Sequence, residues 1–395
     1  MHSPSDDPDP HAVDLHGRHL VLLSWRDTGN PEGGGAELYL QRMAQGLVAR
    51  GARVTFFSAA YPGAAPEETV DGIRYVRRGG KLSVYLQGMR LVLASRLRLR
   101  SGAGRIDAVV DVQNGMPFFS RLVTRGPVVV LVHHVHREQW PIVYPGVRGR
   151  VGWLLESRVA PRLYRHDQYV TVSQATKAEL ARLGVRGPRV AVVHNGTDPA
   201  VEGPRERTPH PSVCVVGRLV PHKRVEHAVD AVLALRERVP GVRLTIVGSG
   251  WWESSLRGYV HDRGAGDLVE FTGWVDDAEK EAVYARSWTM ALPSLKEGWG
   301  LVVGEAARHG TPAVAYRSAG GTRESVDDGV SGLLADDESG FVAALERVLT
   351  DAGLRAALSE GARTHSGGRS WERSQEAFAS VIAAVLRGER VSEDA

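Results

Sequence analysis

Apolar residues along this chain fall into short unbroken runs, separated by longer segments in which they recur every three or four positions. Strands that are buried on both faces give runs of the first kind, and helices with one buried face give the second pattern. In the first half, a helix is expected at residues 36–50. The runs that we expect to form strands are residues 19–25, 53–58, 107–112, 128–132 and 169–172. Their alternation with helical segments predicts an α/β fold with a doubly wound parallel sheet.

The alternation stops at residues 195–211, a turn-rich stretch with four prolines that is typical of a linker. It then restarts with a helix at residues 225–238. The strands expected after the break are residues 213–216, 243–247, 269–271, 289–292 and 313–315. A final amphipathic helix covers residues 371–386. The sequence thus predicts two α/β domains of similar size.

The domain boundaries that we expect follow from these breaks. The first domain covers residues 18–195 and the second covers residues 212–370, with the linker at 196–211. Residues 1–17 contain Pro, Asp and His without any periodicity, so we expect a disordered tail there. A second tail covers residues 388–395.

Composition narrows the class of protein. The chain has 395 residues, of which 43% are apolar and 24% are charged, and its net charge of +3 is too small for bulk binding to nucleic acid. A single cysteine, Cys214, excludes an intramolecular disulfide and a cysteine-based zinc cluster. No apolar run approaches the length of a membrane span, and the polar, acidic start does not resemble a secretory signal. We therefore expect a soluble cytoplasmic protein.

Residues 72–106 contain nine Lys or Arg and no acid. Within them we expect a helix at residues 83–100, whose clear polar stripe is formed by Gln87, Arg90, Ala94 and Arg98. One interpretation is a half-buried helix whose basic side chains extend to solvent. The other is a basic surface for an anionic acceptor or for weak peripheral contact with an anionic membrane, at its inner face in a cell.

The most specific motif covers residues 293–306, directly after a predicted strand. Gly298 and Gly300 allow a sharp bend and a close approach. The helix that starts near Leu301 directs free backbone N–H groups at that point, which favours an anion. Glu297 and Glu305 flank it eight residues apart. Because a phosphate would repel them, we expect these carboxylates to accept hydrogen bonds from hydroxyl groups.

A second motif, residues 216–223, also links a predicted strand to a helix. Arg218 offers a planar fork of donors and Lys223 a point charge, and together they can neutralise a diphosphate without a metal. This pair and the glutamate motif both lie at the carboxyl ends of strands, where open α/β sheets bind ligands.

A third motif is the glycine triplet Gly33, Gly34 and Gly35 between the first strand and the first helix. Such a loop at a helix N-terminus is another place where backbone can meet phosphate. It lacks the G-x-G-x-x-G pattern, so we exclude a nicotinamide site.

Three histidines, His133, His134 and His136, follow the strand predicted at residues 128–132. No cluster of carboxylates or cysteines accompanies them, so we expect one polar histidine at an interdomain cleft and no metal site. The Asp-x-Asp pattern occurs only at Asp7 and Asp9, in the tail expected to be disordered, and we discount it.

Taken together, these motifs resemble the retaining glycosyltransferases of family 4, whose GT-B fold places two Rossmann-like domains across a cleft. Glu297 and Glu305 match the E-x7-E element of the family, and Arg218 and Lys223 match its basic pair on the donor diphosphate. His133 resembles the histidine that faces the donor sugar, although His134 is an alternative. The resemblance extends to Asn195-Gly196 and to residues 320–324 (GGTRE). Trp299 departs from it, since Phe is commoner there.

The resemblance implies roles for these residues. Glu305 would bind the donor ribose and Glu297 the sugar hydroxyls, with His133, Glu297, Arg218 and Lys223 as the catalytic set. The diphosphate would lie on Arg218, Lys223 and the amides near Leu301 and Val302. Other residues that would contact the donor are Gly34, Gly35, Gly298, Trp299 and Gly300. Trp274 and Val275 would lie near its base. The helix at residues 371–387 would cross back to the first, acceptor-side domain.

The implied reaction transfers a sugar from a UDP- or GDP-sugar to a hydroxyl of a small molecule, glycolipid or saccharide, with retention and without a metal or other cofactor. Charge that builds on the leaving phosphate would be stabilised by Arg218, Lys223 and helix amides. Two alternatives stay open: a nucleotide-sugar epimerase of the same architecture, and a non-catalytic nucleotide-sugar binding protein.

Overall fold

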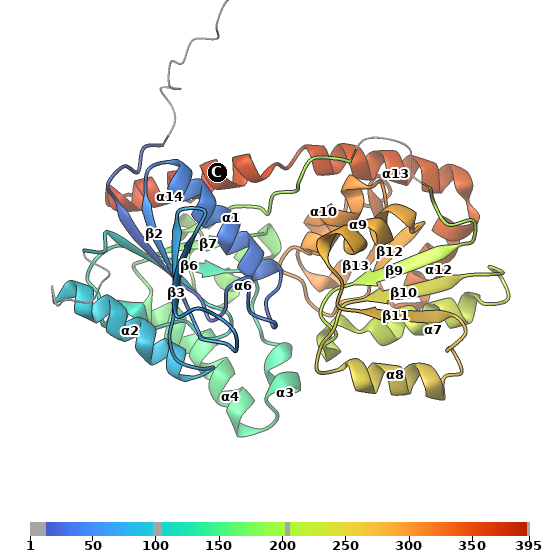
Figure 1. Cartoon of the computed structure of the whole chain (residues 1–395), viewed down its shortest axis with the longest axis horizontal. Helices are drawn as coiled ribbons and strands as arrows, with labels where there is room; N and C mark the ends of the chain where they lie inside the picture. The colour runs from blue at the N-terminus through green and yellow to red at the C-terminus, as the bar shows by residue number, and fades with distance from the viewer. Residues whose placement is uncertain (1–12, 98–104, 202–205, 393–395) are drawn as a thin grey trace, which may run out of the picture.

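Short β-branched runs form the cores of two α/β domains that lie side by side in the computed structural model, which describes residues 13–97, 105–201 and 206–392 (Figure 1). The predicted fold class, two parallel-sheet domains with Rossmann-like winding, is confirmed. In spatial order, the first sheet consists of β3 (Glu67–Val70), β4 (Ile73–Arg77), β2 (Arg53–Ser58), β1 (His19–Leu23), β5 (Ala108–Val112), β6 (Val128–Val132), β7 (Gln168–Thr171) and β8 (Val190–Val192).

Alternate side chains of the first sheet point to opposite faces, and each face has its own layer of helices. Leu20 and Leu22 belong to one buried cluster, and Val21 and Leu23 belong to the other. The helices of this domain are α1 (Gly35–Ala49), α2 (Ser83–Arg96), α3 (Gln139–Val143), α4 (Val147–Leu154), α5 (Ala160–Leu163) and α6 (Gln174–Arg182). A π-helical turn, Leu155–Val159, joins α4 to α5.

The second sheet is parallel throughout, in the order β11 (Val269–Gly273), β10 (Arg243–Val247), β9 (Ser212–Val216), β12 (Thr289–Leu292), β13 (Ala313–Tyr316) and β14 (Gly332–Ala335). A 3-10 turn, Pro221–Lys223, precedes its first helix. The helices of this part of the chain are α7 (Val225–Leu235), α8 (Glu253–Asp262), α9 (Asp277–Arg286), α10 (Leu301–Arg308), α11 (Thr322–Ser325), α12 (Glu338–Thr350), α13 (Ala352–Gly367) and α14 (Trp371–Leu386).

The chain passes between the domains twice, first after β8 and again between α13 and α14, along one edge of the molecule (Figure 1). The two segments lie next to each other, and the Thr197 amide of the first donates to the Arg369 carbonyl of the second at 2.6 Å. The second segment leads into α14, which packs on α1 of the first domain. Phe378 and Ile382 of α14 are fully buried in the first core, and Glu376 forms an ion pair with Arg50.

Two sequence expectations need correction. The tail was expected to extend to Gly17, but Leu15 is 1% exposed and its amide donates to the Arg50 carbonyl, so order begins before Gly17; residues 1–12 lie outside the described part. The first sheet is not wholly parallel, because β3 pairs antiparallel with β4. The charged run of β3 lacks an apolar pattern and was not predicted, and β4, β8 and β14 were not predicted either.

Three arginines near the start of the basic run at residues 72–106 are paired with acids that lie outside the run. Arg77 donates to Asp27 and Glu68, and Arg74 and Arg78 form ion pairs with Glu67. The predicted helix ends at Arg96 in the structure, and Arg98 lies outside the described residues. None of the helices in the described ranges is long and apolar enough to cross a membrane.

Candidate active site

Three motifs that are far apart in the sequence meet where the two domains touch. A Cβ atom added to Gly34 would lie 3.4 Å from Nε of Arg218, and one added to Gly35 would lie 2.9 Å from Cδ1 of Leu301. Arg218 also donates to the Glu32 carbonyl at 3.3 Å. The glycine-rich loop therefore faces both Arg218 and the first turn of α10, and a side chain at Gly35 would have to displace the end of the Leu301 side chain.

A buried ion pair that the sequence analysis missed fixes the glycine-rich loop. Arg26 and Glu37 are 4% and 2% exposed, and Nε of Arg26 donates to Glu37 at 3.0 Å. The other carboxylate oxygen of Glu37 accepts from the Gly34 amide at 2.8 Å. A glutamate three residues after the N-cap is the pattern of a capping box, and that spacing was the available signal for Glu37.

Lys223 and Glu297 form a close ion pair beside this junction, with Nζ 2.5 Å from Oε1. Burial favours the protonated acid and raises the pKa of Glu297, but the charge and hydrogen bond of Lys223 outweigh it and hold that pKa below its usual value. Glu297 is therefore ionised at neutral pH, and Lys223 supplies the compensating charge.

Two glycines let the loop before α10 bend and pack closely against its neighbours. Gly300 has φ of +91°, a left-handed conformation that favours glycine, and α10 begins at Leu301. A Cβ atom on Gly298 would lie 2.4 Å from the His133 carbonyl oxygen of the first domain. The first-turn N–H groups and the positive end of α10 are thus presented at the interdomain junction.

His133 lies in this junction with its ring edge against Tyr39, at 5.3 Å between centroids. It is 7% exposed, and among the described residues its Nε2 atom has no hydrogen-bond partner. Burial lowers the pKa of His133 to about 4, so the ring is neutral at pH 7. An unpaired buried nitrogen in this position fits a hydrogen bond to a ligand.

The other two histidines have partners. His134 contacts Gln139 at 3.2 Å, and His136 lies between Glu156 at 3.0 Å and Asn114 at 2.9 Å. Across residues 13–97, 105–201 and 206–392, no group of three or more His, Cys, Asp or Glu side chains could hold a metal ion.

Glu305 lies one turn into α10, and within the described ranges only one of its carboxylate oxygens contacts other side chains. Its Oε2 atom accepts from the Tyr284 hydroxyl at 2.9 Å and lies 3.6 Å from Nζ of Lys280, whereas Oε1 has no partner among the described residues. Burial raises the pKa of Glu305 despite the opposing charge of Lys280. Trp274 is 77% exposed, and Val275 packs with Val302 on the same core cluster.

Comparisons with known proteins agree with this arrangement. The family model described as Glycosyl transferases group 1 matches residues 200–365, and the one described as Glycosyltransferase Family 4 matches residues 33–201. The chain belongs to glycosyltransferase family 4. Its resemblance to that family, and the GT-B architecture, are thereby confirmed.

Relatives of this family 4 protein align with different fractions of its chain. A D-inositol 3-phosphate glycosyltransferase of Stackebrandtia nassauensis is 29% identical over 97% of this chain and 94% of the relative. A glycogen synthase of Mycobacterium tuberculosis is 33% identical over 57% of this chain, and the match spans 56% of that relative, about half its length. The structure of Anabaena HepE in complex with UDP-glucose has a TM-score of 0.70 at 19% identity, covering 93% of this chain and 99% of HepE, and shows the fold alone.

A contact between the domains of this family 4 protein involves Glu324, in the GGTRE segment. Its two carboxylate oxygens accept from the Gln174 and Ala175 amides at the start of α6, both at 2.9 Å. Trp299 is 4% exposed and its ring lies between His194 and Arg369. The Trp299 side chain is therefore occupied by packing.

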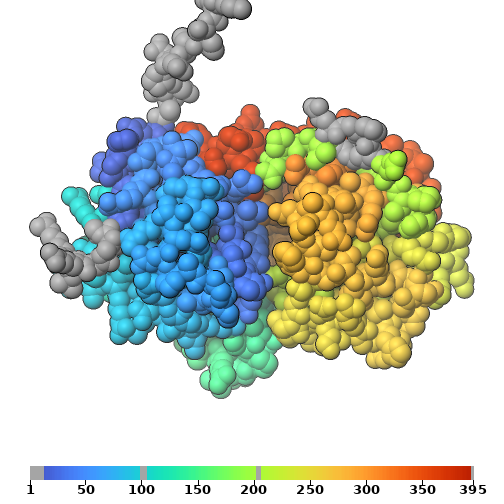
Figure 2. Space-filling model, in the orientation of Figure 1, coloured from blue at the N-terminus to red at the C-terminus, as the bar shows by residue number. Residues whose placement is uncertain are grey.

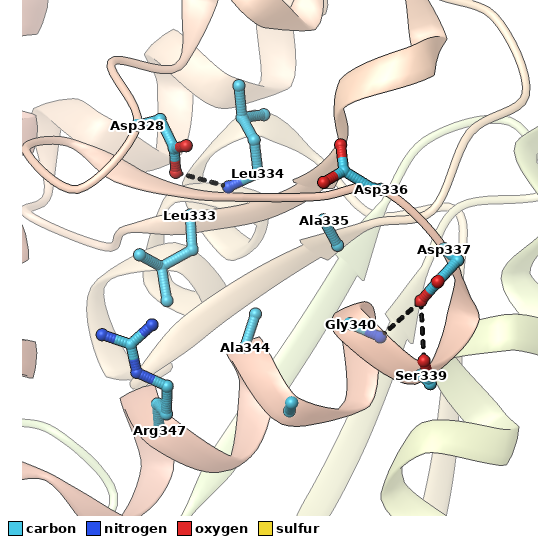
Figure 3. Close-up of a pocket in the computed structure, with 11 residues that line it drawn as sticks. Asp328, Leu333, Leu334, Ala335, Asp336, Asp337, Ser339, Gly340, Ala344 and Arg347 are labelled. Atoms are coloured by element: carbon cyan, nitrogen blue, oxygen red, sulfur yellow. Dashed lines mark hydrogen bonds between the residues drawn. The ribbon is translucent and has the colours of Figure 1, made fainter.

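A pocket of about 450 Å³ on the outer edge of the second sheet is separate from this junction (Figure 3). Its acids are engaged: Asp328 accepts from the Leu334 amide and pairs with Arg317, and Asp337 caps α12 through Gly340. No residue predicted to bind the donor lines it, so it is not part of the candidate active site.

Proposed function

We propose that this protein is a retaining, metal-independent glycosyltransferase that transfers a sugar from a nucleoside-diphosphate sugar to a hydroxyl acceptor. One observation carries the proposal: Arg218, the first turn of α10 and the loop Gly34–Gly35 converge at one place, next to the Lys223–Glu297 pair. Two cations and a helix N-terminus suit a diphosphate, and the missing side chains leave room for it. We place the reaction in the cytoplasm, as the sequence analysis expected.

In the proposed mechanism, negative charge builds on the diphosphate as the bond to the sugar breaks. Arg218, Lys223 and the α10 amides are already in place, so they stabilise the charge that develops more than the ground state. Attack by the acceptor occurs on the face that the diphosphate leaves, and the leaving phosphate oxygen takes the hydroxyl proton. Glu297 and neutral His133 orient the sugar through hydrogen bonds.

For the donor, we propose that the free Oε1 of Glu305 accepts from a ribose hydroxyl and that the base lies near Trp274 and Val275. This assignment rests on the family resemblance and on the orientation of Glu305, whose Oε2 is already held by Tyr284. HepE was solved with UDP-glucose. Both UDP- and GDP-sugars remain donors to test for this protein.

Glu305→Ala is expected to weaken nucleotide binding, whereas Glu297→Ala is expected mainly to lower turnover. Loss of a hydrogen bond to a neutral hydroxyl costs on the order of 1 kcal/mol, so the Kd for free nucleotide rises about fivefold to tenfold in Glu305→Ala. Isothermal titration of both variants with UDP and GDP measures the difference. Equal loss of affinity in both variants would reverse the two assignments.

Activity is expected to persist in excess EDTA, because Arg218 and Lys223 supply the positive charge at the proposed diphosphate site. The measurement compares initial rates in EDTA, in Mg²⁺ and in Mn²⁺ after chelator treatment. Loss of turnover in EDTA that Mg²⁺ or Mn²⁺ restores would contradict the metal-free proposal.

The decisive experiment screens UDP-, GDP- and ADP-sugars by thermal shift and then assays the stabilising donor for hydrolysis and transfer. The proposal expects a raised Tm with one base and release of the nucleoside diphosphate. Conversion of the sugar with the nucleotide still attached would indicate the epimerase alternative. Binding without any turnover would indicate the non-catalytic alternative.

A further inference from the structure

An apolar and basic surface lies on the first domain, outside the site described above. We name it the α3–α4 surface. Its exposed members are Ile142, Val143, Val147, Val151 and Leu154, together with Arg148, Arg150, Arg158 and Arg162. Val147 is 73% exposed, and Val151 and Leu154 are each nearly half exposed. Such a patch on a folded domain needs a partner or a surface to cover it.

The α3–α4 surface is rigid, because α3 and α4 are joined around Trp140. A Cβ atom on Gly152 would lie 2.2 Å from the Trp140 ring, and one on Gly149 would lie 2.3 Å from the Tyr144 carbonyl oxygen. The Trp140 indole N–H also donates to Glu156 at 2.6 Å. With the glycine face of α4 turned inward, positions 147, 151 and 154 lie on the outward face, since they recur every three or four residues.

The charges on this surface are mostly positive. Residues 137–165 contain six arginines and two acids, which are the exposed Glu138 at the start of α3 and Glu156. Glu156 is buried and binds His136 and Trp140. Within the described ranges, the four arginines of the α3–α4 surface form no ion pair with an acid. Exposed valine and leucine flanked by unpaired arginines form the pattern of a helix that lies in the interface of an anionic bilayer.

The position of the surface relates it to the candidate active site. α3 packs against the 3-10 turn Pro221–Lys223, which carries Lys223. Figure 2 shows the segment that contains α3 and α4 projecting from the molecule beneath the line where the two domains meet. The start of α2, where the N-cap residue Leu82 is 78% exposed, belongs to the same layer, since α2 and α5 pack on one core cluster.

We propose that the α3–α4 surface docks this protein on an anionic lipid bilayer. Apolar side chains enter the interface while the arginines contact lipid phosphates. A second copy of the chain fits less well, because a twofold contact would bring the unpaired arginines of both copies together. In combination with the proposed function, docking places the interdomain junction near the membrane, where it can receive a lipid-linked hydroxyl acceptor.

Vesicle sedimentation tests the proposal on the full chain, with vesicles of phosphatidylglycerol and phosphatidylcholine compared with phosphatidylcholine alone. Binding is expected only to the anionic vesicles and is expected to weaken with salt. Arg148→Glu/Arg150→Glu should lower the partition coefficient by about 30-fold or more, since each basic residue contributes ~1 kcal/mol. Val151→Ser/Leu154→Ser should lower it by about tenfold.

The matched control is Arg18→Glu/Arg53→Glu, which makes the same charge change at the other end of the sheet, where β1 and β2 begin. It should bind vesicles nearly as well as the natural chain. Equal loss in this control, or no binding to anionic vesicles at low salt, overturns the proposal. A dimer that the serine variants abolish also overturns it and assigns the surface to a second copy.

Nucleotide titration and thermal unfolding of each variant separate docking from the proposed function. Variants of the α3–α4 surface should keep the nucleotide affinity and Tm of the natural chain. Vesicle binding without donor turnover by any form would reject the proposed function and leave the docking proposal intact.

Discussion

Lys223→Met is expected to reduce kcat/KM by about 100-fold to 1,000-fold, the usual loss when one preorganised donor to a developing negative charge is removed. Lys223 is the nearest cation to Glu297, at 2.5 Å, so the substitution also leaves a buried carboxylate without its partner. Part of the loss would then reflect instability rather than chemistry. Steady-state kinetics with the donor found by thermal shift, together with the unfolding midpoint, measures both effects.

The double variant Lys223→Met/Glu297→Gln separates the two effects. It removes both charges, so stability should recover toward that of the natural chain, because a buried pair replaced by neutral groups is often tolerated. Turnover should stay low, because the diphosphate has lost its cation and the donor sugar has lost the Glu297 carboxylate. Arg286→Ala, an exposed position at the end of α9, serves as the control. Recovery of turnover in the double variant would show that Lys223 serves only to hold Glu297.

Much of the fold could be predicted because central strands carry their own signal. The expected boundaries of β2, β6, β10, β12 and α14 coincide with the structure, since these elements are buried on one or both faces and have an unbroken pattern. Four strands were not predicted: β3, β8 and β14 lie at sheet edges, whereas β4 lies between β3 and β2. Of these, β3 has no buried residue, and β8 and β14 span only three and four residues. The exposed β3 has a weak hydrophobic pattern, whereas β8 and β14 are mostly buried but too short to show a clear period.

Some residues of the candidate site could be predicted from the sequence and others could not. Glu297, Arg218 and the glycine loop stand out because backbone geometry and charge at strand ends restrict the residue types there. Arg26 was not recognised, and Glu324 was recognised only as part of the GGTRE segment, since each acts on a partner from another motif: Arg26 on Glu37, and Glu324 on the α6 amides. Such contacts depend on how the chain folds and leave no local spacing.

A second large effect concerns stability in mild acid. Burial lowers the pKa of both His133 and His222 to about 4. In the unfolded chain the same groups titrate near their ordinary value of about 6.5. The charges that face His133 are Glu37, which raises its pKa, and His136, which lowers it. Around His222, Lys223 and Arg218 lower the pKa and Glu297 raises it; burial dominates in both cases.

The free energy of unfolding is expected to fall as the pH falls, because both rings are neutral in the folded state. Because the folded pKa lies below the unfolded one, the stability that His133 and His222 contribute is complete above about pH 6.5 and is lost as the pH falls toward 4. Between pH 6.5 and 5 the loss is on the order of 2 kcal/mol per histidine. Urea unfolding at pH 7.5, 6 and 5 measures it, and this window lies above the range where most carboxylates protonate.

Asparagine variants locate the effect. His133→Asn and His222→Asn should each flatten the dependence of the unfolding free energy on pH, whereas His261→Asn, at an exposed position in the last turn of α8, should leave it unchanged. Each asparagine variant is compared with itself across the pH series, so any constant cost of the substitution cancels. If His133→Asn and the natural chain lost the same unfolding free energy between pH 7.5 and pH 5, His133 would take up its proton equally in the folded and unfolded states. His133 could then act as a cation beside the donor sugar, and its proposed role as a neutral hydrogen-bonding group would fail.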